Sequence, residues 1–245
     1  MKRAELHRKV RKSHRYLGVA LGVQFLFWTL GGLYFSWSDL DDIHGDHQKA
    51  HIHPIEADVQ LAPIANVLQK LKAKDSVHFI FDVHLIQILN QPVYQIAYSK
   101  QHDRGQKTQL ANAISGELRP ILSKTEVIHV AQSSFSNEAK VKAVEYLTTT
   151  NGHHEYRGQP LPAYAITFEH PSNTTVYVST ELGTVQKFRN NKWRIFDFLW
   201  MLHTMDYQTR DHFGNWVLRA FSILGLVTVF SGFWLFWLSR KKTVV

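Results

Sequence analysis

The stretch WRIFDFLWMLHTMDY, residues 193–207, is apolar and aromatic and holds a single histidine, His203. If it is helical, positions spaced i, i+3, i+4 and i+7 fall on one stripe. That stripe consists of Phe196, Leu199, Trp200, His203 and Tyr207. The opposite side carries Phe198, Met201, Leu202 and Met205. Because both sides are largely apolar, we expect residues 193–212 to form an interfacial helix at the outer edge of a membrane.

Two apolar segments flank the chain. Residues 16–37 carry no charge, and residues 217–238 carry only Arg219, near the end from which it can snorkel. At about 1.5 Å per residue, each reaches roughly 33 Å and can cross a bilayer core. The first ends in aromatic residues and not in a small-residue cleavage site, so we interpret it as an uncleaved anchor. The second has a small-residue stripe suited to helix packing: Ser222, Gly225, Thr228 and Gly232.

The charge distribution supports this topology. The formal net charge is +8, and much of the excess lies at the two ends of the chain. Such a distribution follows the positive-inside rule for two cytoplasmic termini. It differs from the interleaved basic and aromatic residues of a nucleic-acid groove, so no nucleic-acid partner is expected. The chain has no cysteine, which excludes disulfides, thiol catalysis and iron–sulfur ligation.

A histidine-rich stretch, HGDHQKAHIH, occupies residues 44–53. Its histidines are His44, His47, His51 and His53. Since imidazole is a good ligand for transition metals, His47, His51 and His53 are candidates for a metal site, and His44 is a candidate haem ligand. The alternative interpretation is a solvated polar linker.

The middle of the chain contains an internal repeat. The pattern Pro-x-Tyr-x-Ile-x-Tyr at residues 92–98 recurs as Pro-x-Tyr-x-Ile-x-Phe at residues 162–168. Each copy has the period-2 alternation of a half-buried strand. Each is followed by a second strand with a glycine turn, at Gly116 in the first copy and at Gly183 in the second.

A helical pattern precedes each copy. In the first, one face consists of Ile64, Val67, Leu68 and Leu71. In the second, Ala139, Ala143, Tyr146 and Leu147 follow Ser136, a candidate N-cap. We therefore expect two small units of a helix plus an antiparallel sheet. They should pack together, because neither alone would bury much core.

These patterns predict an α+β protein in which two transmembrane helices flank a pair of helix-plus-antiparallel-sheet units. Both termini lie inside and the central domain lies outside, which in a bacterium means the periplasmic side of the inner membrane. The expected parts are a basic cytoplasmic tail (1–15), a first span (16–37), a histidine-rich linker (38–56), two repeats (57–122 and 123–192), the interfacial helix (193–212), a second span (213–239) and a cytoplasmic tail (240–245).

Several motifs resemble the PepSY domain and the PepSY-associated transmembrane family. NAISG at residues 112–116 is similar to the Asp-Ala-x-Thr-Gly turn of PepSY units, and STELG at 179–183 matches it more loosely. HRYLG at 14–18 is similar to the His-Arg-aromatic-x-Gly signature of the family's first helix. WMLH at 200–203 is similar to the Trp-x-Leu-His signature of a later helix, and residues 232–237 approximate its final Gly-x-x-x-Trp. The resemblance covers nearly the whole chain.

The resemblance implies a role in iron metabolism. Members of this family include iron-regulated inner-membrane proteins, some of them ferrisiderophore reductases that carry haem b between transmembrane helices. A flavin reductase or a siderophore receptor system would then be a partner. This chain has two spans where larger members commonly have four, and it has no flavin or nucleotide motif. It would therefore be at most an oxidoreductase subunit, and not an independent reductase.

Four histidines are candidate haem ligands: His14, His44, His203 and His212. His14 shares a helical face with Gly18 and Gly22, which could admit a porphyrin or a partner backbone. In the expected topology His14 lies inside and His203 outside, so the two would serve separate haems. Second ligands could come from other histidines or from another subunit, which predicts a homodimer or a larger membrane complex. The alternatives are a headgroup contact for His14 and a hydrogen bond to Asp206 or to backbone for His203.

A different class of function is also open. PepSY domains outside the cell are associated with restraining or chaperoning proteases, and the edges of their sheets could hold an extended peptide. On this interpretation the spans anchor a periplasmic binding module in the lipid bilayer and the histidines are incidental. A third possibility is an accessory subunit of a larger membrane complex.

Overall fold

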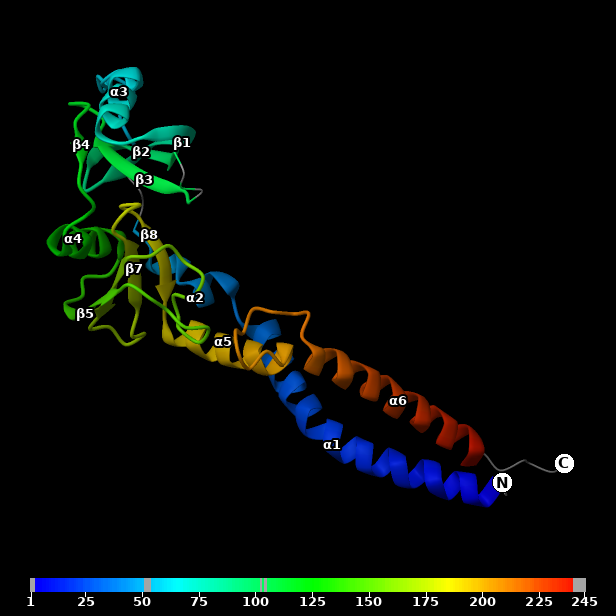
Figure 1. The fold of residues 1–245 in the computed structure, drawn as a ribbon. Helices are drawn as coiled ribbons and strands as arrows, with labels where there is room; N and C mark the ends of the chain where they lie inside the picture. The colour runs from blue at the N-terminus through cyan, green and yellow to red at the C-terminus, as the bar shows by residue number, and fades with distance from the viewer. Residues whose placement is uncertain (1–2, 51–53, 102, 104, 240–245) are drawn as a thin grey trace. The chain divides into compact units, whose positions relative to one another are not determined.

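A computed structural model describes the chain except for residues 1–2, 51–53, 102, 104 and 240–245. The chain divides into two compact units, each described here by itself (Figure 1). The helical unit contains Met1–Asp39 and Arg194–Val245, and the globular unit contains Leu40–Trp193. The expected α+β class is confirmed, with apolar helices near both termini and two four-stranded antiparallel sheets between them.

The globular unit begins with the short helix α2 (Leu40–His44) and the 3₁₀ turn η1 (Asp46–Gln48). Its first repeat consists of α3 (Ile64–Lys74), β1 (Val77–Ile88), β2 (Gln91–Lys100), β3 (Lys107–Asn112) and β4 (Leu118–Arg119). Its second repeat consists of α4 (Lys124–Ser134), β5 (Val141–Leu147), β6 (Ala163–Phe168), β7 (Thr175–Ser179) and β8 (Val185–Arg189). Each sheet is a meander in chain order, β1-β2-β3-β4 and β5-β6-β7-β8, so the duplicated helix-plus-sheet unit is confirmed.

The two glycine turns are equivalent in their hydrogen bonds. Gly116 N–H donates to Asn112 O at 2.8 Å, and Gly183 N–H donates to Ser179 O at 3.0 Å. Both glycines have a left-handed φ, +69° and +70°, as a turn of this kind requires. Gly183 is also tightly packed, because a Cβ built there would lie 2.4 Å from the side chain of Ile88. The turn of the second repeat thus packs directly against the first.

The prediction of a helix after Ser136 is wrong. The helix of the second repeat is α4, which begins after Ser123 with a capping box in which Ser123 and Glu126 bond reciprocally. Residues 141–147 instead form β5, with every third residue from Val141 turned inward. A register shift between Val141 and Ala143 places Val141 and Val144 on one face, while Leu147 joins a separate cluster on the other face of the sheet. Together these give β5 an apolar spacing like that of a helix.

The two repeats share one hydrophobic core. Residues Ile88, Val93 and Leu110 of the first repeat pack with Ile166 and Phe168 of the second. The inner face of α4 contributes its apolar residues Val127, Val130 and Ala131 to this cluster. The inter-repeat packing expected from the small size of each unit is therefore confirmed.

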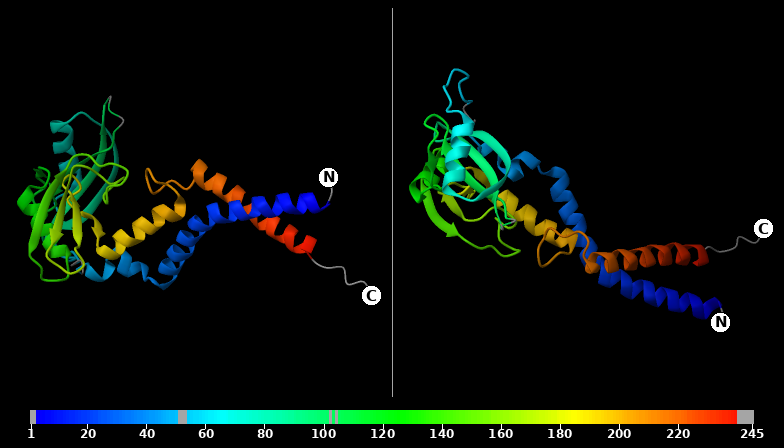
Figure 2. Two further views of the ribbon diagram at one scale, coloured as in Figure 1. Left: turned by 90° about the horizontal axis from the view of Figure 1, so that it is seen from below. Right: turned by 45° about the horizontal axis from the view of Figure 1, so that its top comes forward.

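The helical unit consists of α1 (Arg3–Trp37), α6 (Trp216–Ser239) and the part of α5 (Asn191–Thr204) that begins at Arg194. α1 and α6 lie side by side and antiparallel (Figure 2). Both are long and apolar enough to cross a membrane. Almost none of the apolar part of either helix is buried in the protein, so their apolar side chains face outward.

Candidate functional site

The candidate site is the junction of three helices in the helical unit. α5 and α6 contact different parts of α1. α6 packs along the first part of α1, where Ser231 meets His14 and Phe221 meets Trp28. α5 packs along the second part, where Phe196 contacts Phe35 at a centroid distance of 4.9 Å. Trp28 therefore lies where all three helices meet.

Side chains from neighbouring segments satisfy the carbonyls at the end of α5. The last four carbonyls of a helix lack partners within it, and burying them unpaired is costly. Gln24 Nε2 donates to Leu202 O at 2.6 Å, and Trp28 Nε1 donates to His203 O at 2.8 Å. Asn215 Nδ2 donates to the carbonyl of Thr204 at 2.9 Å. The end of α5 is thereby fixed beside residues that lie inside the apolar part of α1.

The expected extent of this helix is wrong. α5 ends at Thr204 and not at residue 212, and Met205 follows with a left-handed φ of 53°. Tyr207 consequently lies in the connecting loop and does not extend the helical stripe. The loop ends where Asn215 caps α6, since its Oδ1 accepts from Leu218 N–H at 2.8 Å.

The imidazole of His203 is packed among aromatic rings. It stacks on Trp28 at a centroid distance of 5.1 Å and on Trp200 at 6.2 Å, with Phe35 edge-on at 5.9 Å. Its Nδ1 is buried and has no hydrogen-bond partner among the described residues. An iron could therefore reach this imidazole only through Nε2. The ring lacks the Nδ1 partner that usually orients a metal-binding histidine.

Asp206, the partner considered for His203, instead organises the loop. It accepts from the main-chain N–H groups of Gln208, Thr209 and His212 and from the hydroxyl of Thr209. Burial alone would raise the pKa of Asp206, but these hydrogen bonds outweigh it and hold the pKa well below its ordinary value. The carboxylate is thus a structural anion of the turn that connects α5 to α6.

His14 has the environment that His203 lacks. Its Nδ1 lies 2.7 Å from Ser231 Oγ. Thr228 O lies 2.7 Å from the same hydroxyl and can accept its proton, which is the arrangement in which His14 Nδ1–H donates to Ser231 Oγ. In that tautomer Nε2 carries the lone pair that could bind a metal. Ser231 would then orient the imidazole, as hydrogen-bond partners of metal-binding histidines do.

The surroundings of His14 are open on one side. A Cβ built at Gly232 of α6 would lie 3.3 Å from His14 Cε1, so the ring is packed against that glycine. At Gly18 and Gly22, by contrast, a Cβ would meet nothing within 4 Å in the described part of the chain. Gly225 and Gly232 belong to the small-residue stripe expected on α6. A Cβ built at Gly225 would likewise meet nothing within 4 Å among the described residues, whereas one at Gly232 would contact His14 of α1.

The two histidines remain separate in this arrangement. His203 stacks on Trp28, which lies fourteen residues beyond His14 on α1, about 21 Å along a helix axis. They could not ligate one haem within a single chain. His212 is exposed in the loop of the helical unit, and its main-chain N–H donates to Asp206.

The histidine-rich stretch belongs to the globular unit. His44 is exposed at the end of α2, and His47 Nδ1 lies 3.2 Å from Asp42 Oδ1. The predicted metal ligands His51 and His53 lie outside the described residues. Within the described ranges, no three His, Asp or Glu side chains come close enough to hold a metal ion.

Comparisons of the chain with protein-family models, with curated proteins and with solved structures give no match. The resemblance to PepSY proteins therefore remains a prediction. The roles of Gln24 and Asn215 were not predicted, although each had a signal. Gln24 is a polar residue inside an apolar segment, and Asn215 is a capping residue directly before one.

Proposed function

We propose that this chain is a PepSY-type protein of the bacterial inner membrane that binds haem b at His14. In this proposal α1 and α6 are the two spans, both termini are cytoplasmic, and the globular unit lies in the periplasm. The protein serves as a haem-binding or accessory subunit of transmembrane electron transfer linked to ferric or ferrisiderophore reduction. The observation that carries the proposal is the 2.7 Å contact between His14 Nδ1 and Ser231 Oγ, which in the tautomer with Nδ1–H leaves Nε2 for the iron.

The residues around His14 fit a haem. Ser231 fixes the imidazole, and the open faces of Gly18 and Gly22 leave space beside the helix. Arg11 and Arg15 flank His14 on α1 and supply positive charge for the two propionates. Haem, when bound, supplies one-electron redox chemistry. A second chain would contribute a second imidazole from its own His14, which favours a homodimeric four-helix bundle.

His203 has a different role in this proposal. Its stacking partners and the bonds from Gln24 and Trp28 make it part of the helix junction. Nδ1 of His203 has no hydrogen-bond partner among the described residues. Its ring therefore lacks an orienting bond like the one that supports metal ligation by His14. The haem is therefore assigned to His14 alone.

Absorption spectroscopy of the purified full-length protein tests this assignment. After expression with ample haem supply, we expect a Soret band in detergent that is lost in His14→Ala and weakened or shifted in Ser231→Ala. His7→Ala is the matched control, because His7 lies two turns earlier on α1 and bonds only to Arg11 among the described residues. Colourless wild-type protein, or a band that survives His14→Ala, would reject the proposal. Colourless protein would favour the periplasmic binding module.

A further inference from the structure

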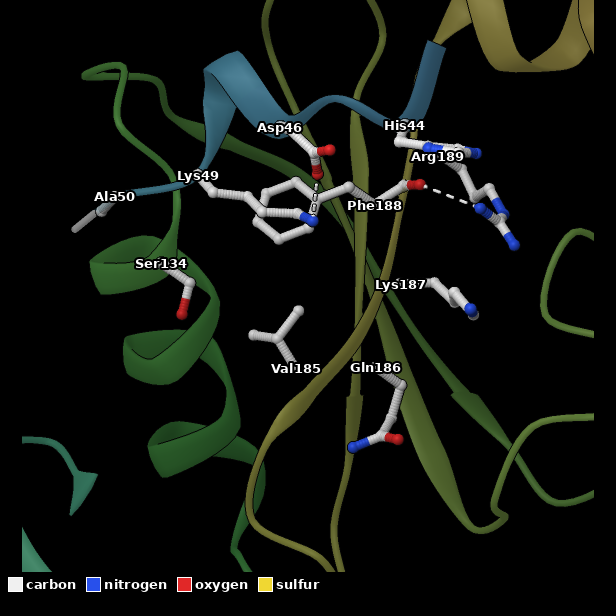
Figure 3. Close-up of a pocket in the computed structure, with 10 residues that line it drawn as sticks. All are labelled: His44, Asp46, Lys49, Ala50, Ser134, Val185, Gln186, Lys187, Phe188 and Arg189. Carbon is white, nitrogen blue, oxygen red and sulfur yellow. Dashed lines mark hydrogen bonds and ion pairs between the residues drawn. The ribbon is translucent and has the colours of Figure 1, made fainter. Parts of the chain in front are cut away.

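A pocket in the globular unit lies beside the edge strand β8 (Figure 3). It has a volume of about 470 Å³, within the range of small-molecule sites. Its walls are the successive residues of β8, the segment around η1 and the end of α4. Because β8 is the last strand of its sheet, its outer edge faces this pocket and not another strand of the sheet.

Basic side chains line this pocket, with Lys187 and Arg189 on one side of β8 and Lys49 on the other (Figure 3). They are His44, Lys49, Lys187 and Arg189, and the single acidic residue among the lining side chains is Asp46. Lys49 pairs with Asp46 and lies 5.8 Å from the ring centroid of Phe188. The charge of Asp46 is therefore already engaged, and the pocket keeps a net positive charge.

Arg189 is held in place by the protein. Its Nε donates to Glu155 O at 3.0 Å, and its guanidinium lies 3.9 Å from the ring centroid of Trp193. These contacts fix the guanidinium in place. A pre-positioned cation of this kind favours anion binding without a large ordering cost.

Lys187 differs from Arg189 and Lys49, whose charged groups both have contacts within the protein. Its side chain is half-buried, and no hydrogen bond or ion pair to it is found within the described residues. Burial, together with the nearby charges of Arg189 and Lys49, lowers the pKa of its ammonium group. A partly desolvated cation among other cations is unfavourable unless an anion accompanies it.

We propose that this pocket binds a small anionic ligand that carries carboxylate or phosphate groups, with Lys187 as its principal contact. The fixed guanidinium of Arg189 adds long-range attraction. Gln186 also lines the pocket, and its amide nitrogen donates to Thr184 within the protein. A register shift in β8 places the side chain of Gln186 there. The proposal does not depend on haem, because the pocket lies wholly within the globular unit.

Isothermal titration of the full-length protein in detergent tests the site, with citrate and inorganic phosphate used separately as probes. We expect saturable binding of at least one probe, and an affinity at least about tenfold lower in Lys187→Met, as for a lost charge-assisted contact. Lys142→Met is the matched control, because Lys142 is an exposed lysine on β5, at the opposite edge of the same sheet. The stronger probe identifies whether carboxylate or phosphate is preferred.

Two further measurements separate binding from folding. Without a ligand, Lys187→Met should melt no lower than wild type, since it removes a crowded cation. In reductively ¹³C-methylated protein, the saturating probe should raise the pKa of the Lys187 resonance. Absence of binding by both probes, or equal losses in Lys187→Met and Lys142→Met, would overturn the proposal. His14→Ala should leave the titration unchanged, so failure of haem binding and failure of this site are distinguishable.

Discussion

Replacing Gln24 by leucine should detach the end of α5 from α1. Gln24 is one of the polar residues inside the apolar part of α1, and its Nε2 bonds to Leu202 O at 2.6 Å. Gln24→Leu leaves that carbonyl without its partner at a helix end where water does not readily replace it. A stranded buried acceptor costs about 1–3 kcal/mol, whereas measured interhelical bonds in membranes contribute about 0.6–1.7 kcal/mol. We expect a loss of about 1–2 kcal/mol in the free energy of unfolding.

The greater apolarity of leucine does not offset this loss. In detergent, α1 stays in the micelle in both the folded and the unfolded protein. Leucine at position 24 is therefore better solvated by a similar amount in both states, and the free energy of unfolding does not gain from it. Thr29→Val is the matched control, because Thr29 Oγ1 bonds within α1 to Phe25 O and to no other helix among the described residues. It should change the stability by less than about 0.5 kcal/mol.

Equilibrium unfolding of the full-length protein in mixed micelles of mild detergent and SDS measures both variants. Circular dichroism follows the helices, and tryptophan fluorescence reports on the junction, which contains Trp28 and Trp200. A Gln24→Leu variant that is as stable as Thr29→Val, or more stable than wild type, would contradict the role assigned to Gln24. Trp28→Phe should show a loss at least as large, since it removes the bond to His203 O and leaves part of the indole's volume unfilled beside His203.

Three further changes test the remaining structure. Gly183→Ala should destabilise the globular unit in thermal unfolding, and the loss should exceed that of Gly158→Ala by at least about 2 kcal/mol. Both glycines have a positive φ, but of the two only Gly183 has close neighbours. Ser123→Ala should cost about 1 kcal/mol in chemical unfolding through loss of the α4 capping box, and Ser123→Asp should restore most of it. The pKa of Asp206 is depressed on folding, so the stability that Asp206 contributes is present above its unfolded pKa and is lost as the pH falls toward its folded pKa. Asp206→Asn should reduce the fall in unfolding free energy as the pH is lowered, and an unchanged pH dependence would contradict this role of Asp206.

The repeats could be predicted because their signals are local. A proline-led alternating strand followed by a glycine turn specifies the same hairpin wherever it occurs, and the two glycines adopt nearly the same φ. The helix of the second repeat was misplaced because one bulge, together with burial on both faces of β5, gives its apolar residues a spacing of three. β1 shows the same effect, with Val77, Ile80 and Val83 turned toward one core and register shifts between them. The Ser-x-x-Glu of Ser123 and Glu126 was the stronger helix signal.

Partners across the helical unit could not be predicted from residue patterns. The sequence marks Gln24 as an anomaly in an apolar segment, but its acceptor lies far along the chain, at Leu202. Similarly, Ser231 in α6 has no pattern that connects it to His14. Such pairs depend on how the helices pack, which follows from the whole set of apolar contacts and not from any short motif.

His14 and His203 were equivalent candidates in sequence, each a single histidine within an apolar or juxtamembrane helix. Their hydrogen bonds separate them. Ligand histidines normally donate their second N–H to a fixed acceptor, which sets both the tautomer and the ring plane. His14 has such a partner in Ser231, whose own proton can be accepted by Thr228 O. The main-chain carbonyl of His203, by contrast, accepts a hydrogen bond from Trp28. The imidazole of His203 stacks on the indoles of Trp28 and Trp200. The ring of His203 and its main-chain carbonyl therefore both contribute to the junction of the three helices, which gives the aromatic stretch around His203 a structural role.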